Sequence, residues 1–435
     1  MSVSGEGRAR WVAVVCAVVL FVAVGVVLVI TTPWDPLPGV AGVSVDPGRD
    51  FTAAQIERAR EFDAALAPAA YGGLVVGLAL VLVLGLTPLG ARFVGWVTAR
   101  VPRWPLRVAV AALALAVVLR VAALPFRVWS SSVLRRYGLT TQSWTSWFGD
   151  QARSLAVTWV LWTIVLLLLV LLLRRFPRYW WTGAALGGFL LVVAGSFAYP
   201  VVVEPVFNDF KPLPAGALRS DLLAMADRDG VPVREVLVAD ASRRTTTLNA
   251  YVSGFGSTRR IVVYDTLLAS PPERVRSIVA HELGHAARGD VLYGTLLGAL
   301  GVAGAMCLLG ALLTSPRLLR RAGLDPGGEG AATPRAAALV LALVTVGTQV
   351  SAPVQNLVSR RIEARADVHA LDLTRDPATF AAMQRELARR NISDLDPDPL
   401  ERLLWSTHPS SPERIALARA WARHHGAPEP PPGAP

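Results

Sequence analysis

Long apolar stretches, separated by short polar segments, form the dominant pattern along this chain. A helix needs about 20 mostly apolar residues to cross the hydrocarbon core of a bilayer. The pattern therefore predicts a mainly α-helical membrane protein with seven transmembrane helices. The seven stretches lie at residues 11–30, 71–89, 108–124, 154–173, 181–203, 291–313 and 336–357.

The first apolar stretch admits a second interpretation, because Arg8 and Arg10 precede it as basic residues precede a secretory signal. The apolar core of a signal is usually about 7–15 residues long, and this stretch is longer. We therefore expect an uncleaved membrane span. The third stretch contains Arg120, which either extends to the membrane interface or faces a polar interior.

The apolar and polar stretches together divide the chain into five parts. The last of these parts is rich in proline, which predicts a disordered tail. The expected order is five membrane helices with their loops (1–203), a first polar segment (204–290), membrane helices six and seven (291–357), a helical C-terminal segment (358–427) and the tail (428–435).

The first polar segment carries signals for both strands and a helix. Residues 236–240 and 260–264 are rich in β-branched side chains and predict two strands of a small β-sheet. A helix is expected over 271–288, because Ser270 suits an N-cap and Pro271 suits the first helical position. The segment therefore has the composition of a small folded domain rather than of a linker.

The composition agrees with a membrane protein. Of the 435 residues, 53% are hydrophobic and 17% are charged, whereas a soluble domain carries about 25% charged residues. The net charge of +11 comes almost entirely from arginine, since Lys211 is the only lysine. No basic stripe alternates with aromatic residues in a polar segment, so we expect no nucleic-acid partner.

The two cysteines, Cys16 and Cys307, both lie in apolar stretches. They indicate neither a disulfide framework nor a thiolate metal site. Any bound metal must therefore be held by histidine and carboxylate side chains.

The expected helix over 271–288 carries the pattern HExxH. His281 and His285 are four residues apart, so both rings project from one face of the helix, as two zinc ligands do. Glu282 lies beside them, where it can act on a metal-bound water. The chain has only six histidines, and a chance HExxH is expected in roughly a few per thousand such chains. The pattern therefore predicts a metal site.

A catalytic zinc usually has three protein ligands and one open position. Glu363 and Asp367 are four residues apart in a second helical segment, so they share a face. Glu363 could bind the metal, and Asp367 could accept the second ring N–H of a liganding histidine. His369 is a competing ligand on another face, and carboxylates among arginines also suit an ordinary solvated helix. Spacing alone leaves these alternatives open.

Several further motifs follow one another along the chain. They are LPF at 124–126, YGLTTQ at 137–142, FNDFKPLP at 207–214, NAY at 249–251, RIVVYDTL at 260–267, HELGH at 281–285, EARAD at 363–367, STHP at 406–409 and ERI at 413–415. Their order resembles a known family, the type I CAAX prenyl endopeptidases, which are gluzincin-type polytopic membrane zinc metalloproteases. The resemblance covers most of the chain, and the region before about residue 68 departs most from the family pattern.

This resemblance implies a fold and a function. The fold would be a seven-transmembrane-helix barrel that encloses a chamber, with a gluzincin-like metallopeptidase domain containing a small β-sheet. The protein would be a multi-pass zinc metalloendopeptidase of the cell membrane with one Zn²⁺ per chain. Its substrate would be a peptide or protein that is lipidated or associated with the lipid bilayer.

The resemblance also implies a role for each candidate site residue. Glu363 would be the third metal ligand beside His281 and His285, and Asp367 would support the ligands. Glu282 would be the general base, and His408 would stabilise the oxyanion. Asn249 and Ala250 on an edge strand would hold the substrate backbone, and Arg414 would bind substrate or support the same site.

Two alternatives to this function are a quality-control metalloprotease of the heat-shock type and a non-catalytic membrane scaffold or transporter. The orientation in the membrane is contradictory as well. Arginine-rich loops at 92–107, 174–178 and 317–335 share one side of a seven-span arrangement, which the positive-inside rule places in the cytoplasm with the catalytic segments outside. The family resemblance implies the opposite orientation.

Overall fold

The computed structural model describes residues 3–39, 44–254, 256 and 259–433. Within them, seven helices are long and apolar enough to cross a membrane, which confirms the predicted number. Their bounds are Gly7–Thr31, Ala53–Leu86, Trp104–Arg136, Trp144–Arg175, Trp180–Phe207, Asp290–Leu313 and Pro334–Thr374.

The helices of the N-terminal half are long and antiparallel, with one short helix between the second and third spans. Near the end of the fifth span a π-helical turn, η2 (Tyr199–Val203), widens the helix before it enters the polar segment. The helices are α1 (Val3–Thr31), α2 (Ala53–Leu86), α3 (Pro88–Val97), α4 (Trp104–Arg136), α5 (Trp144–Arg175), α6 (Trp180–Ala198) and α7 (Glu204–Phe207).

The C-terminal half alternates between spanning helices and a polar part of the fold. This polar part contains the HExxH segment and is named the catalytic part after its expected function. Short 3-10 turns are η1 (Pro47–Arg49), η3 (Ala241–Arg243), η5 (Leu267–Ala269) and η6 (Pro334–Ala336). The helices are α8 (Ala217–Arg228), α9 (Pro272–Arg288), α10 (Asp290–Leu313), α11 (Pro316–Arg321), α12 (Ala337–Thr374), α13 (Pro377–Asn391), α14 (Pro399–Leu404) and α15 (Ser411–His424).

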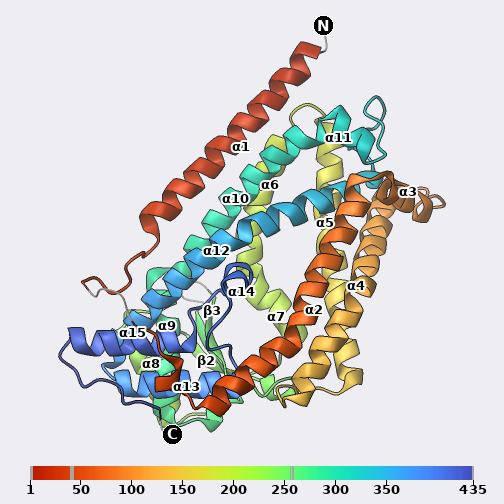
Figure 1. Cartoon of the computed structure of the whole chain (residues 1–435). Coiled ribbons are helices and arrows are strands. Elements are labelled where there is room, and N and C mark those ends of the chain that lie inside the picture. Colours follow the sequence, from red (N-terminus) through yellow and green to blue (C-terminus); the bar gives the residue numbers. More distant parts are fainter. Residues whose placement is uncertain (1–2, 40–43, 255, 257–258, 434–435) are drawn as a thin grey trace.

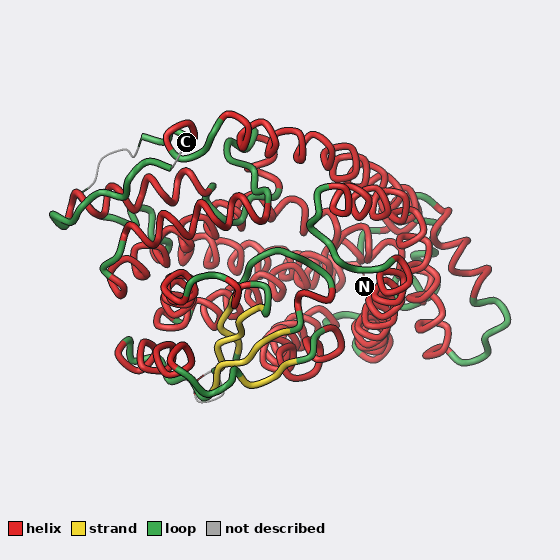
Figure 2. The backbone as a smooth tube through the Cα atoms, turned by 90° about the horizontal axis from the view of Figure 1, so that it is seen from below, coloured by secondary structure: helices red, strands yellow, loops and turns green. Residues whose placement is uncertain are grey.

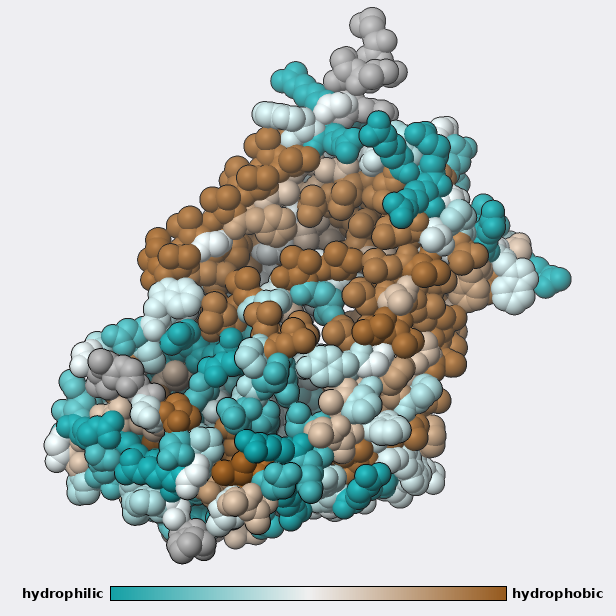
Figure 3. Space-filling model, viewed as in Figure 1, coloured by the Kyte–Doolittle hydropathy of each residue, from teal (hydrophilic) through white to brown (hydrophobic). Residues whose placement is uncertain are grey.

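Six of the seven spanning helices close a ring. Neighbouring helices touch in the order α10, α6, α5, α4, α2 and α12, and α12 returns to α10. The seventh, α1, packs along α10 (Figure 1). Many large apolar side chains on these helices are exposed, and Figure 3 shows them as a hydrophobic belt beside a polar catalytic part. This distribution suits helices that face lipid, since hydrocarbon does not penalise exposed apolar groups.

The catalytic part is built around a four-stranded mixed sheet in the order β1-β2-β4-β3 (Figure 2). The two predicted strands pair in parallel in the register Leu237↔Val262. The residue pattern did not predict β1 or β3, which are short and lie antiparallel at the two edges; only the family resemblance placed Asn249 and Ala250 on an edge strand. The strands are β1 (Phe210–Pro212), β2 (Glu235–Ala239), β3 (Ala250–Ser253) and β4 (Arg260–Tyr264).

Two membrane helices lead directly into the catalytic part. Gly289 ends α9 with a left-handed conformation (φ 67°), and α10 begins at the next residue. A left-handed residue with no Cβ lets the chain turn sharply there. The helix α12 extends over 38 residues from the membrane into the catalytic part. The expected boundary at 357–358 therefore falls inside one continuous helix.

The arginine-rich loops lie at the end of the molecule that carries α3 and α11 (Figure 1). The sheet, α13 and α15 lie at the opposite end. The structure has the seven spans that the sequence predicted. The arginine-rich loops and the catalytic segments therefore remain on opposite sides of the membrane, as assumed when the positive-inside rule was applied.

Residues 428–433 of the proline-rich tail, for which the sequence predicts disorder, contact the rest of the fold. The carbonyl of Pro430 accepts a hydrogen bond from Arg419 (3.3 Å), and the Gly433 amide donates to the carbonyl of Arg49 (3.1 Å). Proline segments form no internal backbone hydrogen bonds, so their carbonyls are free to accept from guanidinium groups. The last two residues of the tail, 434–435, lie outside the described residues.

The contact between the tail and the N-terminal loop surrounds a buried ion cluster. The Asp50 side chain is 1% exposed and accepts two hydrogen bonds from Arg419, at 2.6 and 2.7 Å. Arg385 donates a third, at 3.2 Å. The cluster joins the loop before α2 to α13 and α15. Asp50 therefore has a structural role, although no sequence motif singled it out.

Replacing Asp50 with alanine should destabilise the fold by about 3–5 kcal/mol, because it leaves the buried guanidinium of Arg419 and the partly buried one of Arg385 without a counter-charge. Thermal unfolding of the purified protein in detergent measures this loss. Asp35→Ala is the matched control, since Asp35 is exposed on the same loop. Equal unfolding temperatures for the two variants would contradict the assignment.

Candidate metal centre

Helix α9 positions the HExxH residues through its buried apolar face. Val275, Val279 and Leu283 are fully buried in the core of the catalytic part. The helix begins at Pro272 with Glu273 in its first turn, and Pro271 rather than the expected Ser270 occupies the N-cap position. Ser270 instead hydrogen-bonds Glu386 on α13 (3.0 Å).

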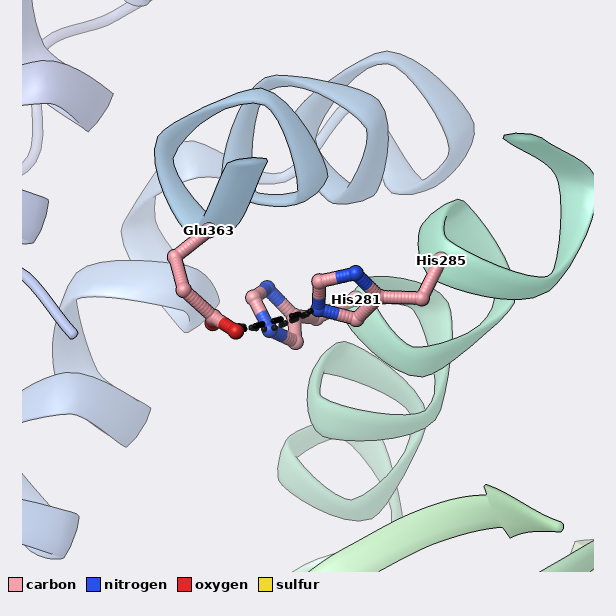
Figure 4. Close-up of side chains that lie close together, drawn as sticks. All are labelled: His281, His285 and Glu363. Atoms are coloured by element: carbon pink, nitrogen blue, oxygen red, sulfur yellow. Dashed lines mark hydrogen bonds and ion pairs between the residues drawn. The ribbon is translucent and has the colours of Figure 1, made fainter. Parts of the chain in front are cut away.

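Three side chains from α9 and α12 converge on one point (Figure 4). His281 Nε2 lies 3.3 Å from His285 Nε2 and 3.1 Å from Glu363 Oε2. His285 Nε2 lies 3.5 Å from Glu363 Oε1. The structure therefore brings together the two histidines and the one carboxylate that the sequence singled out as metal ligands.

The spacing of these atoms fits a tetrahedral zinc ion. Zinc binds imidazole nitrogen and carboxylate oxygen at about 2.0–2.2 Å, which places tetrahedral ligand atoms about 3.3 Å apart. The two Nε2 atoms lie 3.3 Å apart, and their distances to the Glu363 carboxylate, 3.1 Å to Oε2 and 3.5 Å to Oε1, are close to this value. Two nitrogens and one oxygen are also the donor set of many catalytic zinc sites, with the fourth position open.

The second ring nitrogen of each histidine faces a carboxylate. His281 Nδ1 lies 2.8 Å from Asp367 Oδ1, and His285 Nδ1 lies 2.9 Å from Asp290 Oδ2. An Nδ1–H donor in each ring leaves the Nε2 lone pair free for a metal. Sequence analysis missed Asp290, because the break at Gly289 hides the geometric relation between an α9 histidine and the first residue of α10.

Arg414 supports Asp367 in this structure. Its guanidinium donates two hydrogen bonds to the Asp367 carboxylate, one of them from Nε at 2.8 Å. Arg414 Nη2 also lies 3.2 Å from His281 Nδ1. Since Nδ1 donates to Asp367, it cannot accept from Arg414 as well, so we treat this approach as packing. The position suits the supporting role expected for Arg414, whereas a substrate contact stays a prediction.

The negative charge around the two rings favours a cation. Burial opposes protonation of His281, but hydrogen bonds to Asp367 and Glu363 outweigh burial and raise its pKa. For His285, burial is likewise outweighed by Asp290 and Glu363, which raise its pKa to about 10. A proton and a metal ion compete for the same nitrogens, so the groups that attract the proton also attract a divalent cation.

Glu282 lies beside the two histidines and makes no hydrogen bond or ion pair with the residues that the structure describes. Burial raises the pKa of its carboxyl, and the His281 and His285 rings oppose this shift. A carboxyl without a protein partner is available to a substrate or a water molecule.

His408 reaches the same centre from the loop between α14 and α15. Its Nε2 lies 3.3 Å from Glu363 Oε2, its Nδ1 pairs with the Thr407 hydroxyl at 2.8 Å, and its side chain is 57% exposed. Although more than half of the side chain is exposed, partial desolvation by the surrounding protein lowers the pKa of His408, and Glu363 opposes this shift. The ring therefore borders the ligand cluster and remains open to an incoming substrate.

Asn249 and Ala250 lie at the start of the edge strand β3. Ala250 begins the edge strand β3, which packs against α9, and Asn249 directly precedes it. The Asn249 side chain is exposed, while its carbonyl accepts a hydrogen bond from the Tyr264 amide (3.0 Å). An edge strand has unpaired backbone groups that can bind an extended peptide.

His369, the competing ligand, points away from the cluster. Its Nε2 lies 3.0 Å from Asp229 Oδ2 at the end of α8. Its ring packs against Gly284 of the HELGH segment, where an added Cβ would lie 3.0 Å from His369 Cβ. The glycine thus permits close approach of α9 and α12, which is what brings Glu363 to the histidines.

Comparison with known proteins identifies the family. The model of peptidase family M48 matches residues 212–422. The model described as the CAAX prenyl protease N-terminal region with five membrane helices matches residues 50–209. The chain belongs to peptidase family M48. The motif-based resemblance to the type I CAAX prenyl endopeptidases is thereby confirmed.

Relatives of this M48 peptidase match most of its length. A protein of Bacillus subtilis described as uncharacterized metalloprotease YhfN is 29% identical, over 90% of this chain and 91% of its own. The CAAX prenyl protease 1 of Saccharomyces cerevisiae is 26% identical over 67% of each chain. The CAAX prenyl protease 1 homolog of Oryza sativa is 28% identical over 67% of this chain and 68% of its own.

The fold of this M48 peptidase has a known counterpart. The crystal structure of S. mikatae Ste24p superposes with a TM-score of 0.76 and covers 94% of this chain and 99% of that chain, at 19% identity. Family membership makes the protein a metalloendopeptidase, and its seven apolar helices make it a multi-pass membrane protein. A non-catalytic scaffold or transporter is not favoured.

A second group of carboxylates lies elsewhere in this M48 peptidase. Asp63 on α2, Asp394 after α13 and Glu401 on α14 come within metal-ligand reach of one another, and each is half-buried. Burial and the neighbouring carboxylates raise the pKa of Glu401 to about 7. The proximity of these carboxylates favours the protonated form of Glu401, and the trio lacks the histidine ligands of the first centre.

Proposed function

We propose that this M48 peptidase is a zinc-dependent endopeptidase with one zinc ion per chain, held by His281, His285 and Glu363. The observation that carries this proposal is the convergence of their three ligand atoms at the spacing of a tetrahedral zinc site. Asp367 and Asp290 support it, because each fixes a histidine in the tautomer that presents Nε2.

The chemistry assigns Glu282 the proton transfers of peptide hydrolysis. Zinc, when bound, polarises the scissile carbonyl and lowers the pKa of a coordinated water. Glu282 accepts a proton from the attacking water and then donates it to the leaving amine, as one group acting first as base and then as acid. Its position beside the two histidines suits both transfers, as does its lack of a hydrogen-bond partner among the residues that the structure describes.

His408 and the edge strand would hold the substrate during these transfers. His408 Nε2 borders the ligand cluster, so it can donate a hydrogen bond to the oxygen on which negative charge develops. Asn249 and the backbone of Ala250 would pair with an extended substrate along the free edge of β3. Arg414 would keep Asp367, and through it the His281 ring, in place.

We further propose that the substrates are lipidated or otherwise membrane-associated proteins. The curated relatives include proteins named CAAX prenyl protease 1. The position of the site supports the proposal independently, since α9 continues directly into the membrane helix α10 and Glu363 lies on the extension of α12. A substrate anchored in the bilayer would therefore present its polar end close to the metal centre.

The experiment that tests the proposal combines metal analysis with substrate identification. The purified protein should contain about one zinc per chain and should lose peptidase activity with a chelator and regain it with zinc. Membrane proteomics of cells that produce the wild type or Glu282→Gln should then show peptides cut only by the wild type. A zinc-free active protein would contradict the metal assignment, and cleavage of soluble proteins alone would contradict the substrate class.

A further inference from the structure

Asp290 joins the metal centre to the membrane helices. It is the first residue of α10, directly after the Gly289 turn, and its side chain is 11% exposed. One carboxylate oxygen, Oδ2, lies 2.9 Å from His285 Nδ1. The other, Oδ1, accepts a hydrogen bond from Arg365 Nη2. Both oxygens are thus engaged, one by the histidine and one by the guanidinium.

Arg365 lies on α12, two residues after Glu363. The same helix therefore supplies a metal ligand and the cation that holds the partner of His285. Among neighbours in the six-helix ring, α10 and α12 touch least. Figure 1 shows the two helices side by side near the catalytic part and diverging toward the opposite end. The Asp290–Arg365 ion pair joins the first residue of α10 to α12.

The two histidines are supported in matching ways from different parts of the fold. His281 contacts Asp367, which in turn contacts Arg414 on α15 within the catalytic part. His285 contacts Asp290 on α10, which in turn contacts Arg365 on α12. A change in the separation of α10 and α12 would therefore act first on the His285 side of the metal centre.

We propose that Asp290 and Arg365 are positioning residues for the reaction, which fix the ring of His285 and couple its orientation to the packing of α10 against α12. This inference rests on the proposed zinc site. Outer-shell partners of metal-bound histidines typically contribute about 10–100-fold to metal affinity. The Asp290 carboxylate acts directly on the ring, whereas Arg365 acts through Asp290, so the loss of Asp290 should have the larger effect.

Zinc affinity and zinc release rate of the full-length protein in detergent test this inference, measured by competition with a chromophoric chelator. We expect Asp290→Ala to weaken zinc binding by about 10–100-fold. Asp290→Asn keeps an oxygen that accepts from Nδ1 and should lose less. Arg365→Gln should fall between Asp290→Asn and the wild type, and Arg365→Lys should recover most of the affinity, because it restores a cation beside Asp290.

Arg276→Gln is the matched control. Arg276 lies on the metal helix α9 and forms an ion pair with Asp221 (2.8 Å), but this pair touches neither histidine. Thermal unfolding of the zinc-free proteins reports any purely structural contribution. If Asp290→Ala lowers only the unfolding temperature and keeps wild-type zinc affinity, the positioning role is overturned. If Arg276→Gln weakens zinc as much as Arg365→Gln, the specific link to His285 is overturned.

The wild type separates failure of this inference from failure of the zinc site. A wild type that binds no zinc would contradict the proposed function itself. A wild type that binds zinc tightly, together with an Asp290→Ala protein that binds it equally well, would contradict only the positioning role. In the supported case the wild type binds zinc, and the affinity falls in the order Arg365→Gln, Asp290→Asn, Asp290→Ala.

Discussion

Replacing Glu282 with glutamine should abolish peptide cleavage while zinc stays bound. The amide keeps the size of the side chain but can neither accept the proton of the attacking water nor return it to the leaving amine. General acid–base catalysis is worth about 10²–10⁴-fold, and Glu282 serves both transfers, so we expect a fall on the order of 10⁴-fold in kcat/KM. The rate of cleavage of a membrane-anchored fluorogenic peptide measures this fall in kcat/KM.

The same helix offers a control for this substitution. Glu273 is exposed in the first turn of α9, about two helical turns before His281. Glu273→Gln should therefore leave both cleavage and zinc content unchanged. Full activity of Glu282→Gln would falsify the assignment of Glu282 as the base. A loss of zinc from Glu282→Gln would show instead that this carboxyl helps to hold the metal.

Replacing Glu363 with glutamine should remove the metal. Glu363 supplies the one anionic ligand of the proposed set, and an amide oxygen is a weaker donor to zinc than a carboxylate. The loss in affinity should exceed the roughly 10–100-fold that changes in outer-shell partners cause, and cleavage should fall with it. Zinc content after dialysis and the zinc affinity in chelator competition measure the effect.

Glu329→Gln is the control for the change of one carboxylate to an amide. Glu329 lies in the segment between α11 and α12 and is 68% exposed in its pair with Arg174. Figure 1 shows α11 at the end of the molecule opposite the sheet. The replacement of Glu329 should alter neither zinc content nor cleavage. If Glu363→Gln retained wild-type zinc affinity, Glu363 would not be a ligand, and the third ligand would have to come from another residue such as His408.

The spans and the HExxH helix could be predicted because their signals are local. A helix that crosses lipid must satisfy its backbone within itself, so its length and apolar character are written in consecutive residues. The two histidines share a face because a helix places residues four apart on one side. The expected helix over 271–288 differs by a single residue from α9 (Pro272–Arg288). These predictions needed no knowledge of the tertiary structure.

The short edge strands show the limit of local signals. Only three residues form β1 and four form β3. Neither segment is long enough to show the alternation of apolar and polar residues that predicts a strand. Their backbone groups become strands because β2 and β4 offer partners. The free edge of β3, to which we assign substrate binding, therefore exists only in the assembled sheet.

Sequence by itself determined the membrane class, the seven spans and, through the order of its motifs, the family. Tertiary structure decided which distant groups meet. It placed Glu363 in the cluster and turned His369 toward Asp229. The contact of Asp290 with His285 also depends on the folded chain, because it crosses a helix break. The physical reason is that helix periodicity acts over a few residues, whereas a metal centre requires atoms within a few ångströms that come from separate helices.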